Sequence, residues 1–334
     1  MGQLLSHPVE EKSIEFREHS SISYCIGSMQ GYRMTMEDAH DVRVSDDEKL
    51  AVYGVFDGHG GKEIAEILRD KLVALIFKTL QTCIKQNANT ELSTYIRLIK
   101  DCFFKVDAGL PESLAANCGS TAIITTVIAG KYVIVANTGD SRSILSLQGG
   151  CSKNLSFDHK PSTMGERVRI ENSGGYVING RVNEILALSR AFGDFNFKLP
   201  YLSLNPTGQH NAYLEQNRSI IKNNVIELPP ELYQVSVEPD VLVYDLSCQS
   251  EPEFIVLACD GIWDCYTNDA LIQVIRKRLR DGWTLQHITE FVLNDCISMA
   301  NNITGIGFDN MTIMIVALHS NASLEQWTEQ FRKK

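Results

Sequence analysis

The sequence lacks the features of membrane and secreted proteins. Its apolar runs are all shorter than the roughly 18 residues that a membrane-spanning helix needs. The segment from Met1 to Pro8 has no basic flank followed by an apolar run, which a secretory signal would show. The nine cysteines are an odd number without a C-x-x-C pair, which disfavours a disulfide framework or a zinc site. We therefore expect a cytoplasmic protein that could also enter the nucleus.

Positive charge is scarce as well. The 334 residues include 31 lysines and arginines against 41 aspartates and glutamates, a formal net charge of −10. This balance disfavours broad nucleic-acid binding, which needs a basic face to neutralise phosphates. With 44% hydrophobic and 22% charged residues, the chain is neither disordered nor fibrous. Its length allows a sizeable core, and the absence of a convincing linker predicts one domain.

Strands and helices are expected in clusters. Short β-branched or aromatic runs bounded by Gly, Asn or Asp predict strands at 50–56, 121–129, 131–136, 143–147, 254–258 and 311–318. Apolar residues at helical spacing predict helices over 64–76, 92–106, 271–279 and 285–299. Two helices after the first strands and two before the last favour an α+β layered domain over an alternating parallel fold.

Three acids stand where predicted strands begin or end. Asp57 follows the strand 50–56, Asp260 follows 254–258 and Cys259, and Asp309 precedes 311–318. Because the end of one antiparallel strand lies beside the start of its neighbour, we expect the three to converge on one sheet edge. Carboxylates gathered there, with no cysteine partner, indicate Mg²⁺ or Mn²⁺. Any single one of these acids, each followed by Gly or Asn, fits an ordinary turn better than a site; three of them beside a Gly-His-Gly-Gly run at 58–61 favour a site.

Two further segments carry residues suited to the same site. Arg33 precedes Glu37 and Asp38 by four and five positions, and an arginine fork matches a phosphate group bidentately. The two acids could reach a metal directly or through its water. Asp140 lies in a turn between two predicted strands. Taken alone, each segment is also compatible with a surface turn that holds a local ion pair.

These residues belong to an ordered series of motifs that resembles the type 2C protein phosphatases, which are metal-dependent serine/threonine phosphatases, and most of all their fungal members. The resemblance extends from about residue 22 to about residue 318. It rests on Arg33-x-x-Met36-Glu37-Asp38, Val55 to Gly61, Cys118 to Ala122, Asn137 to Arg142, Asp158 to Pro161, Leu188 to Asp194, Leu257 to Asp264, and Asp309 to Thr312.

The resemblance implies a central β-sandwich of two mainly antiparallel sheets with helices on both outer faces (α-β-β-α). It implies a catalytic domain over 22–320, with an N-terminal segment at 1–21, an insertion at about 199–232 and a C-terminal tail at 321–334. The insertion, rich in Asn, Pro and Gln, could select substrates or partners, or be a tolerated surface loop.

The resemblance also implies two bound Mn²⁺ or Mg²⁺ ions and a weaker third. Asp57 would bridge the first two, with the Gly58 carbonyl completing one coordination sphere. The remaining ligands would be Asp260 and Asp309 for one ion, Glu37 and Asp38 for the other, and Asp140, Asp260 and Asp264 for the third.

The implied reaction is hydrolysis of phosphoserine and phosphothreonine in proteins by a hydroxide that bridges the two ions. Arg33 would bind the phosphate oxygens, and His59 would be the general acid for the leaving alkoxide. One alternative is a silent member that binds phosphoproteins without hydrolysing them; another is a two-metal hydrolase of nucleotides or nucleic acid. The complete ligand set and the motif order favour the phosphatase. We expect a monomer that acts in signalling on phosphorylated proteins.

The N-terminus fits an acylation pattern. Met1-Gly2-x-x-x-Ser6 matches the N-myristoylation motif, with Gly2 as the acceptor. A single myristoyl chain binds membranes only marginally. The acidic residues that follow, beginning with Glu10 and Glu11, offer no basic patch as a second anchor. At most, weak membrane association is expected.

Overall fold

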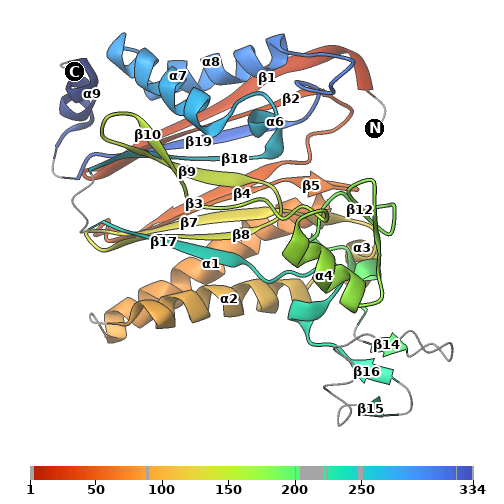
Figure 1. Cartoon of the computed structure of the whole chain (residues 1–334). Helices are drawn as coiled ribbons and strands as arrows, with labels where there is room; N and C mark the ends of the chain where they lie inside the picture. The colour runs from red at the N-terminus through yellow and green to blue at the C-terminus, as the bar shows by residue number, and fades with distance from the viewer. Residues whose placement is uncertain are drawn as a thin grey trace.

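The fold is a sandwich of two antiparallel sheets with helices on both outer faces (Figure 1). The computed structural model describes residues 4–87, 90–199, 201–203, 221–222, 225–246, 251–320 and 322–332. The predicted α-β-β-α class is confirmed. Among the described residues, no helix combines the length and the apolar character that crossing a bilayer would require.

One sheet has six strands, and it carries the helices α7 (Asn268–Arg280) and α8 (Leu285–Ser298) on its outer face (Figure 1). Ile288 and Val292 of α8 share a buried cluster with Ile313 and Ile315. The strands lie in the order β1 (Leu4–Glu18), β2 (Ile22–Arg33), β19 (Met311–Leu318), β18 (Pro252–Ala258), β9 (Arg142–Leu147) and β10 (Cys151–Asn154).

The other sheet has five strands, and it carries α1 (Glu63–Gln86) and α2 (Leu92–Ala108) on its outer face (Figure 1). Along β4, Val52 and Phe56 pack toward α1 and α2, whereas Tyr53 and Val55 pack between the sheets. Burial on both faces explains the uninterrupted apolar run of this strand. The order is β17 (Asp240–Asp245), β8 (Tyr132–Thr138), β7 (Ala122–Ile128), β4 (Leu50–Phe56) and β3 (Ala39–Val44).

Short elements surround one end of the sandwich. A three-stranded sheet has the order β13 (Phe192–Gly193), β6 (Gly119–Ser120) and β5 (Gly58–His59). The others are α3 (Glu112–Ala115), α4 (Met164–Asn172), the hairpin of β11 (Val177–Ile178) and β12 (Arg181–Val182), the 3₁₀ turns Phe195–Phe197 and Pro230–Leu232, and α6 (Asp260–Trp263). The described part of the predicted insertion contributes β14 (Tyr201–Ser203), β15 (Ile221–Lys222) and β16 (Val225–Glu227), a separate small sheet beyond α4 in Figure 1. Residue 200, residues 204–220 and residues 223–224 of the insertion lie outside the described residues.

β1 belongs to the six-stranded sheet and α9 packs on its outer face, although 1–21 and 321–334 are predicted to lie outside the catalytic domain. β1 pairs with β2 from Leu4 opposite Arg33 to Glu18 opposite Ser23. Pro8, which has no N–H to donate, is tolerated because β1 is an edge strand. At the other end, α9 (Leu324–Arg332) buries Trp327 in the cluster beneath α7 and α8.

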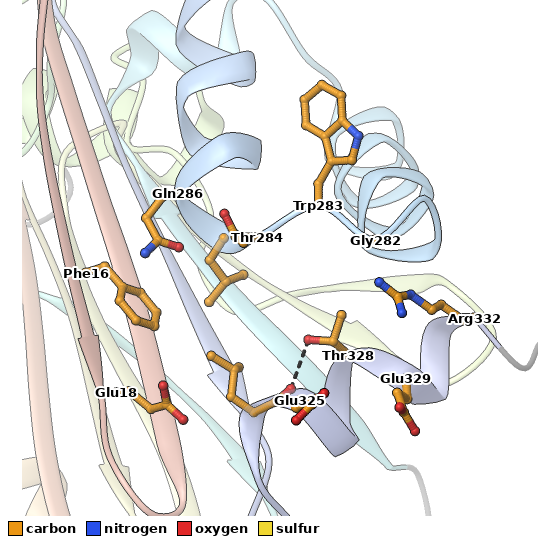
Figure 2. Close-up of a pocket in the computed structure, with 12 residues that line it drawn as sticks. Phe16, Glu18, Gly282, Trp283, Thr284, Gln286, Glu325, Thr328, Glu329 and Arg332 are labelled. Atoms are coloured by element: carbon orange, nitrogen blue, oxygen red, sulfur yellow. Dashed lines mark hydrogen bonds between the residues drawn. The ribbon is translucent and has the colours of Figure 1, made fainter.

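A pocket of about 470 Å³ lies between α9, β1 and the turn that joins α7 to α8. Figure 2 shows Phe16 of β1, Trp283 of the turn and Glu325 of α9 around this space. None of the acids of the predicted metal site lines it. Figure 1 places α9 at the end of the sandwich opposite β5.

Trp327→Ala is expected to lower the free energy of unfolding by about 3–5 kcal/mol, because a large buried ring would leave a cavity. The Trp327 side chain is 3% exposed, and its Nε1–H donates to the carbonyl oxygen of Glu253 at 3.1 Å. Denaturant unfolding measures the change, and exposed Gln330→Ala, expected within about 0.5 kcal/mol of the unsubstituted protein, is the control. A loss below about 1 kcal/mol for Trp327→Ala would show that α9 is dispensable to the fold.

Candidate active site

The predicted acids meet at one end of the sandwich, but across the two sheets. Asp57 follows β4 of the five-stranded sheet, whereas Asp260 and Asp309 flank the paired strands β18 and β19 of the six-stranded sheet. The expectation of a single sheet edge is therefore wrong, since the antiparallel-neighbour argument holds only for β18 and β19. Burial, and then the charges of Asp260, Asp38 and Asp309, raise the pKa of Asp57 well above its usual value.

Asp38 brings a further carboxylate to this cluster from the segment between β2 and β3. Its Oδ2 accepts a hydrogen bond from Thr312 Oγ1 at 2.7 Å, and burial raises the pKa of Asp38 to about 7. Its Oδ1 is buried and has no hydrogen-bond partner among the described residues. A buried carboxylate oxygen without a partner is costly, and a bound cation would satisfy it.

A thiol lies beside these carboxylates, contrary to the expectation of a site without a cysteine. A potential ligand atom of Cys259 lies within 4.8 Å of one from Asp38 and one from Asp57, and those two also lie within 4.8 Å of each other. Cys259 Sγ accepts from the backbone N–H of Thr312 at 3.1 Å and donates to the carbonyl oxygen of Asn310 at 3.5 Å. Burial, with the charge of Asp38 next, raises the pKa of Cys259 well above its usual value. Because a protonated thiol is a poor ligand, the donors remain hard oxygens that fit Mg²⁺ or Mn²⁺.

Arg33 and Glu37 are held at the cluster by hydrogen bonds. Arg33 Nη2 donates to Asp309 Oδ2 at 2.6 Å, and the arginine side chain is 43% exposed. The backbone N–H of Glu37 donates to Asn310 Oδ1 at 2.9 Å, while Glu37 Oε2 accepts from the backbone N–H of Gly61 at 3.3 Å. Asn310 thus fastens the segment 33–38 beside Asp309. Neither Asn310 nor Thr312 was predicted to have a role, although both belong to the motif Asp309 to Thr312.

The residues after Asp57 form β5, which pairs with β6. A Cβ added at Gly58 would lie 2.6 Å from the backbone oxygen of Glu37, so only glycine fits against the segment 33–38. His59 Nε2 lies 2.7 Å from Asp194 Oδ2. Burial acts to lower the pKa of His59, but the charge and hydrogen bond of Asp194 outweigh it and raise that pKa. Sequence reasoning missed Asp194, whose only signal was its place at the end of a motif.

The three acids of the predicted weaker site are also neighbours. Burial, followed by the charges of Asp140, Asp309 and Asp264, raises the pKa of Asp260 well above its usual value. Asp140 is buried, and its Oδ2 accepts a hydrogen bond from Lys160 Nζ. Asp264, which follows α6, is exposed. All predicted ligand acids therefore gather at one end of the sandwich, while Gly2 lies outside the described residues.

Comparison with known proteins agrees with this arrangement. The family profile described as Protein phosphatase 2C matches residues 22–304. Protein phosphatase 2C homolog 4 of Saccharomyces cerevisiae is 38% identical over an alignment that covers 100% of this chain and 98% of the relative. Protein phosphatase 2C homolog 3 of Schizosaccharomyces pombe is 35% identical, with 98% of this chain and 72% of the relative covered.

Solved structures share the fold. A phosphatase from Toxoplasma gondii superposes with a TM-score of 0.71 at 24% identity, covering 94% of this chain and 97% of that one. A serine-threonine phosphatase 2C from the same organism gives 0.69 at 19% identity, covering 92% and 99%. At these identities the structures support the fold alone, whereas the profile and the two yeast relatives extend over nearly the whole chain. The chain therefore belongs to the Protein phosphatase 2C family of metal-dependent serine/threonine phosphatases.

Proposed function

We propose that the acidic end of the sandwich binds two Mg²⁺ or Mn²⁺ ions and hydrolyses phosphoserine and phosphothreonine in proteins. The observation that carries this proposal is the buried cluster of like charges, in which Asp38 Oδ1 has no hydrogen-bond partner among the described residues. Carboxylates so close together repel each other, and divalent cations would remove that repulsion. The family is metal-dependent, but the number of ions is part of the proposal.

The cluster divides into ligand groups. The charges of Asp260, Asp38 and Asp309 all act on Asp57, which would serve both ions together with the carbonyl oxygen of Gly58. Bound ions of this kind supply a water molecule that loses a proton near neutral pH and attacks phosphorus. The remaining groups would be Asp260 with Asp309, Glu37 with Asp38, and, for a weaker third ion, Asp140 with Asp260 and Asp264.

Two side chains would act on the phosphate ester itself. Arg33 can turn its partly exposed guanidinium toward the phosphate oxygens and bind them through two parallel N–H donors. His59, whose pKa is raised by the charge and hydrogen bond of Asp194 against the opposing effect of burial, would donate a proton to the departing seryl or threonyl oxygen. An alkoxide is a poor leaving group, so this proton lowers the barrier to cleavage.

The direct test is an assay of the purified chain with a phosphothreonine peptide, with Mn²⁺ and then with excess EDTA. We expect turnover with Mn²⁺ and its loss with EDTA. Binding of the peptide without release of phosphate would indicate the silent alternative. Faster cleavage of bis(p-nitrophenyl) phosphate, a diester, than of the phosphopeptide would indicate a nuclease-like hydrolase instead.

Arg33→Ala is expected to raise the KM for a phosphothreonine peptide by roughly 10- to 100-fold, the value of one or two charge-assisted hydrogen bonds. Arg33→Lys should recover only part of this loss, because lysine keeps the charge but not the fork. Steady-state kinetics at saturating Mn²⁺ separates KM from kcat. Arg43→Ala, which removes a half-exposed arginine paired with Asp41 on β3, is the matched control. An unchanged KM for Arg33→Ala would argue against phosphate binding.

The remaining proposals concern the environment of the enzyme. Gly2 is N-myristoylated and gives weak membrane association to a monomeric, cytoplasmic and nuclear enzyme that acts on signalling phosphoproteins. The Met1-Gly2-x-x-x-Ser6 pattern supports the acylation of Gly2 and its weak membrane association. The spacing of the cysteines, without a C-x-x-C pair, supports the cytoplasmic location. Mass spectrometry that finds Gly2 unmodified or acetylated would refute acylation. A dimeric mass in light scattering would refute the monomer.

Deletion of the insertion at 199–232 tests whether this segment selects substrates. An unchanged substrate preference after the deletion would contradict that role.

A further inference from the structure

The smallest sheet of the molecule brings a carboxylate against His59. In the order β13-β6-β5, Gly119 of the middle strand pairs with His59 on one side and with Gly193 on the other. Asp194 directly follows β13, so its side chain meets the imidazole across Gly119. A Cβ added at Gly119 would lie 2.3 Å from Asp194 Oδ2 and 2.5 Å from His59 Nε2. Glycine at this position therefore leaves the space in which the two side chains form their hydrogen bond.

The backbone around Asp194 is firmly anchored. Asp194 has a φ of 53°, in the left-handed region, and its N–H donates to the carbonyl oxygen of Cys118 at 3.1 Å. The preceding residue, Gly193, donates its N–H to Asp107 Oδ1 at 2.9 Å. The same carboxylate of α2 accepts from Lys198 Nζ at 2.7 Å, in an ion pair whose two residues are both buried. A left-handed aspartate persists where its surroundings fix it, and here the anchors hold the carboxylate in one place.

We propose that Asp194 is a positioning residue that fixes the ring orientation and the tautomer of His59. A carboxylate can only accept, so His59 Nε2 carries the hydrogen that it donates to Asp194 Oδ2 at 2.7 Å. This leaves Nδ1 as the ring nitrogen that can carry the transferable proton of the protonated ring. The inference rests on the proposed function, in which His59 protonates the leaving oxygen. As the P–O bond breaks, the proton on Nδ1 passes to the departing seryl or threonyl oxygen, while Nε2–H stays bonded to Asp194.

Asp194→Gly and Asp194→Asn test this role without straining the backbone, because glycine and asparagine both tolerate a left-handed conformation. In the Mn²⁺-loaded enzyme, Asp194→Gly is expected to lower kcat for a phosphothreonine peptide by roughly 10- to 100-fold and to leave KM within about twofold. The kcat for p-nitrophenyl phosphate should fall by no more than about threefold, because its phenolate leaves without a proton. Asp194→Asn, whose amide oxygen can still accept from Nε2–H, should retain more activity.

Two controls distinguish positioning from a merely structural role. In a His59→Gln background, Asp194→Gly should cost almost nothing further, because both changes act through one side chain. Asn179→Gly removes the side chain at another left-handed residue, in the turn between β11 and β12, and should leave both activities unchanged. Nitrogen-15 spectra of the histidine rings in the Mg²⁺-loaded protein, recorded at a pH where the His59 ring is neutral, should show one fixed Nε2–H tautomer for His59, assigned by its loss in His59→Gln. Asp194→Gly should convert that signal to a mixture of tautomers.

Equal losses on both substrates, full additivity with His59→Gln, or an unchanged ring signal in Asp194→Gly would each overturn the inference. The His59→Gln variant distinguishes a failure of proton donation by His59 from a failure of the role of Asp194. If it loses activity equally on both substrates, proton donation by His59 fails and the role of Asp194 fails with it. If His59→Gln shows the leaving-group dependence and Asp194→Gly does not, only the role of Asp194 is lost.

Discussion

Asp57→Asn is expected to abolish metal-dependent turnover, with a fall in kcat/KM of roughly 10³-fold or more. The Asp57 carboxylate lies at the centre of the acidic cluster: after burial, its pKa is raised most by Asp260, then by Asp38 and Asp309. A carboxamide has the same shape, but it removes one negative charge and one hard oxygen ligand. Phosphate release from a phosphothreonine peptide across a Mn²⁺ titration measures the loss. Near-normal turnover would refute the metal site.

The stability of the metal-free protein shows whether the lost activity is caused by unfolding. The folded-state pKa values of Asp57 and Asp38 are raised, that of Asp38 to about 7, above the value near 3.9 of an unfolded aspartate. The folded protein then binds more protons than the unfolded chain, so its stability falls as the pH rises from about 4 through about 7. In EDTA near neutral pH, Asp57→Asn removes part of this repulsion and should unfold at the same or a higher temperature.

With Mn²⁺ present, the unsubstituted protein should unfold at a higher temperature than Asp57→Asn, because a ligand that binds only the folded state stabilises it by mass action. The unsubstituted protein should gain more in Tm from Mn²⁺ than Asp57→Asn does. Asp101→Asn, a change of the same chemistry on the exposed face of α2, should behave like the unsubstituted protein in both assays. A lower Tm of Asp57→Asn in EDTA would attribute its inactivity to damage of the fold.

The strands that hold these acids could be predicted from the sequence because they are buried on both faces. The prediction for β4 (Leu50–Phe56) and for β19 (Met311–Leu318) agrees with the structure at both ends of each strand. Each is an apolar run with a polar boundary. β1 was missed, since an edge strand needs one buried face at most, and Glu10, Glu11 and Lys12 hide its periodicity. α9 was missed because two buried aromatic residues in a short helix give a weak pattern.

The acids of the site could be predicted from their places at the ends of strands, but their arrangement in space could not. That β4 lies in one sheet and β18 and β19 in the other is a property of the topology, so the sequence did not predict that Asp57 faces Asp260 across the sandwich. The contact between His59 and Asp194 depends on strands of two residues, which are too short for any periodic signal. Such a pair follows only from the long-range pairing of β5, β6 and β13.

His59→Gln is expected to lower kcat for a phosphothreonine peptide by about 10² to 10⁴-fold, the usual effect of losing a general acid. Glutamine can still hydrogen-bond to Asp194, but it has no proton to transfer. The KM should change little, because His59 is proposed to act on the leaving oxygen and not to bind the phosphate. The effect on p-nitrophenyl phosphate should be much smaller. His287→Gln, at an exposed position in the first turn of α8, is the matched control.

The change of kcat with pH is a further test of His59 as the acid, and its direction follows from the pKa shift of His59. Burial alone would lower the pKa of His59, but the charge and hydrogen bond of Asp194 raise it above its ordinary value. The protonated, active form therefore persists to higher pH than in a free histidine, and activity on the phosphopeptide should fall as the pH rises through the raised pKa. This alkaline limb should be absent in His59→Gln, and it should be weak for p-nitrophenyl phosphate in the unsubstituted enzyme. An alkaline limb that survives in His59→Gln would assign the titrating proton to another group and would remove His59 from the role of acid.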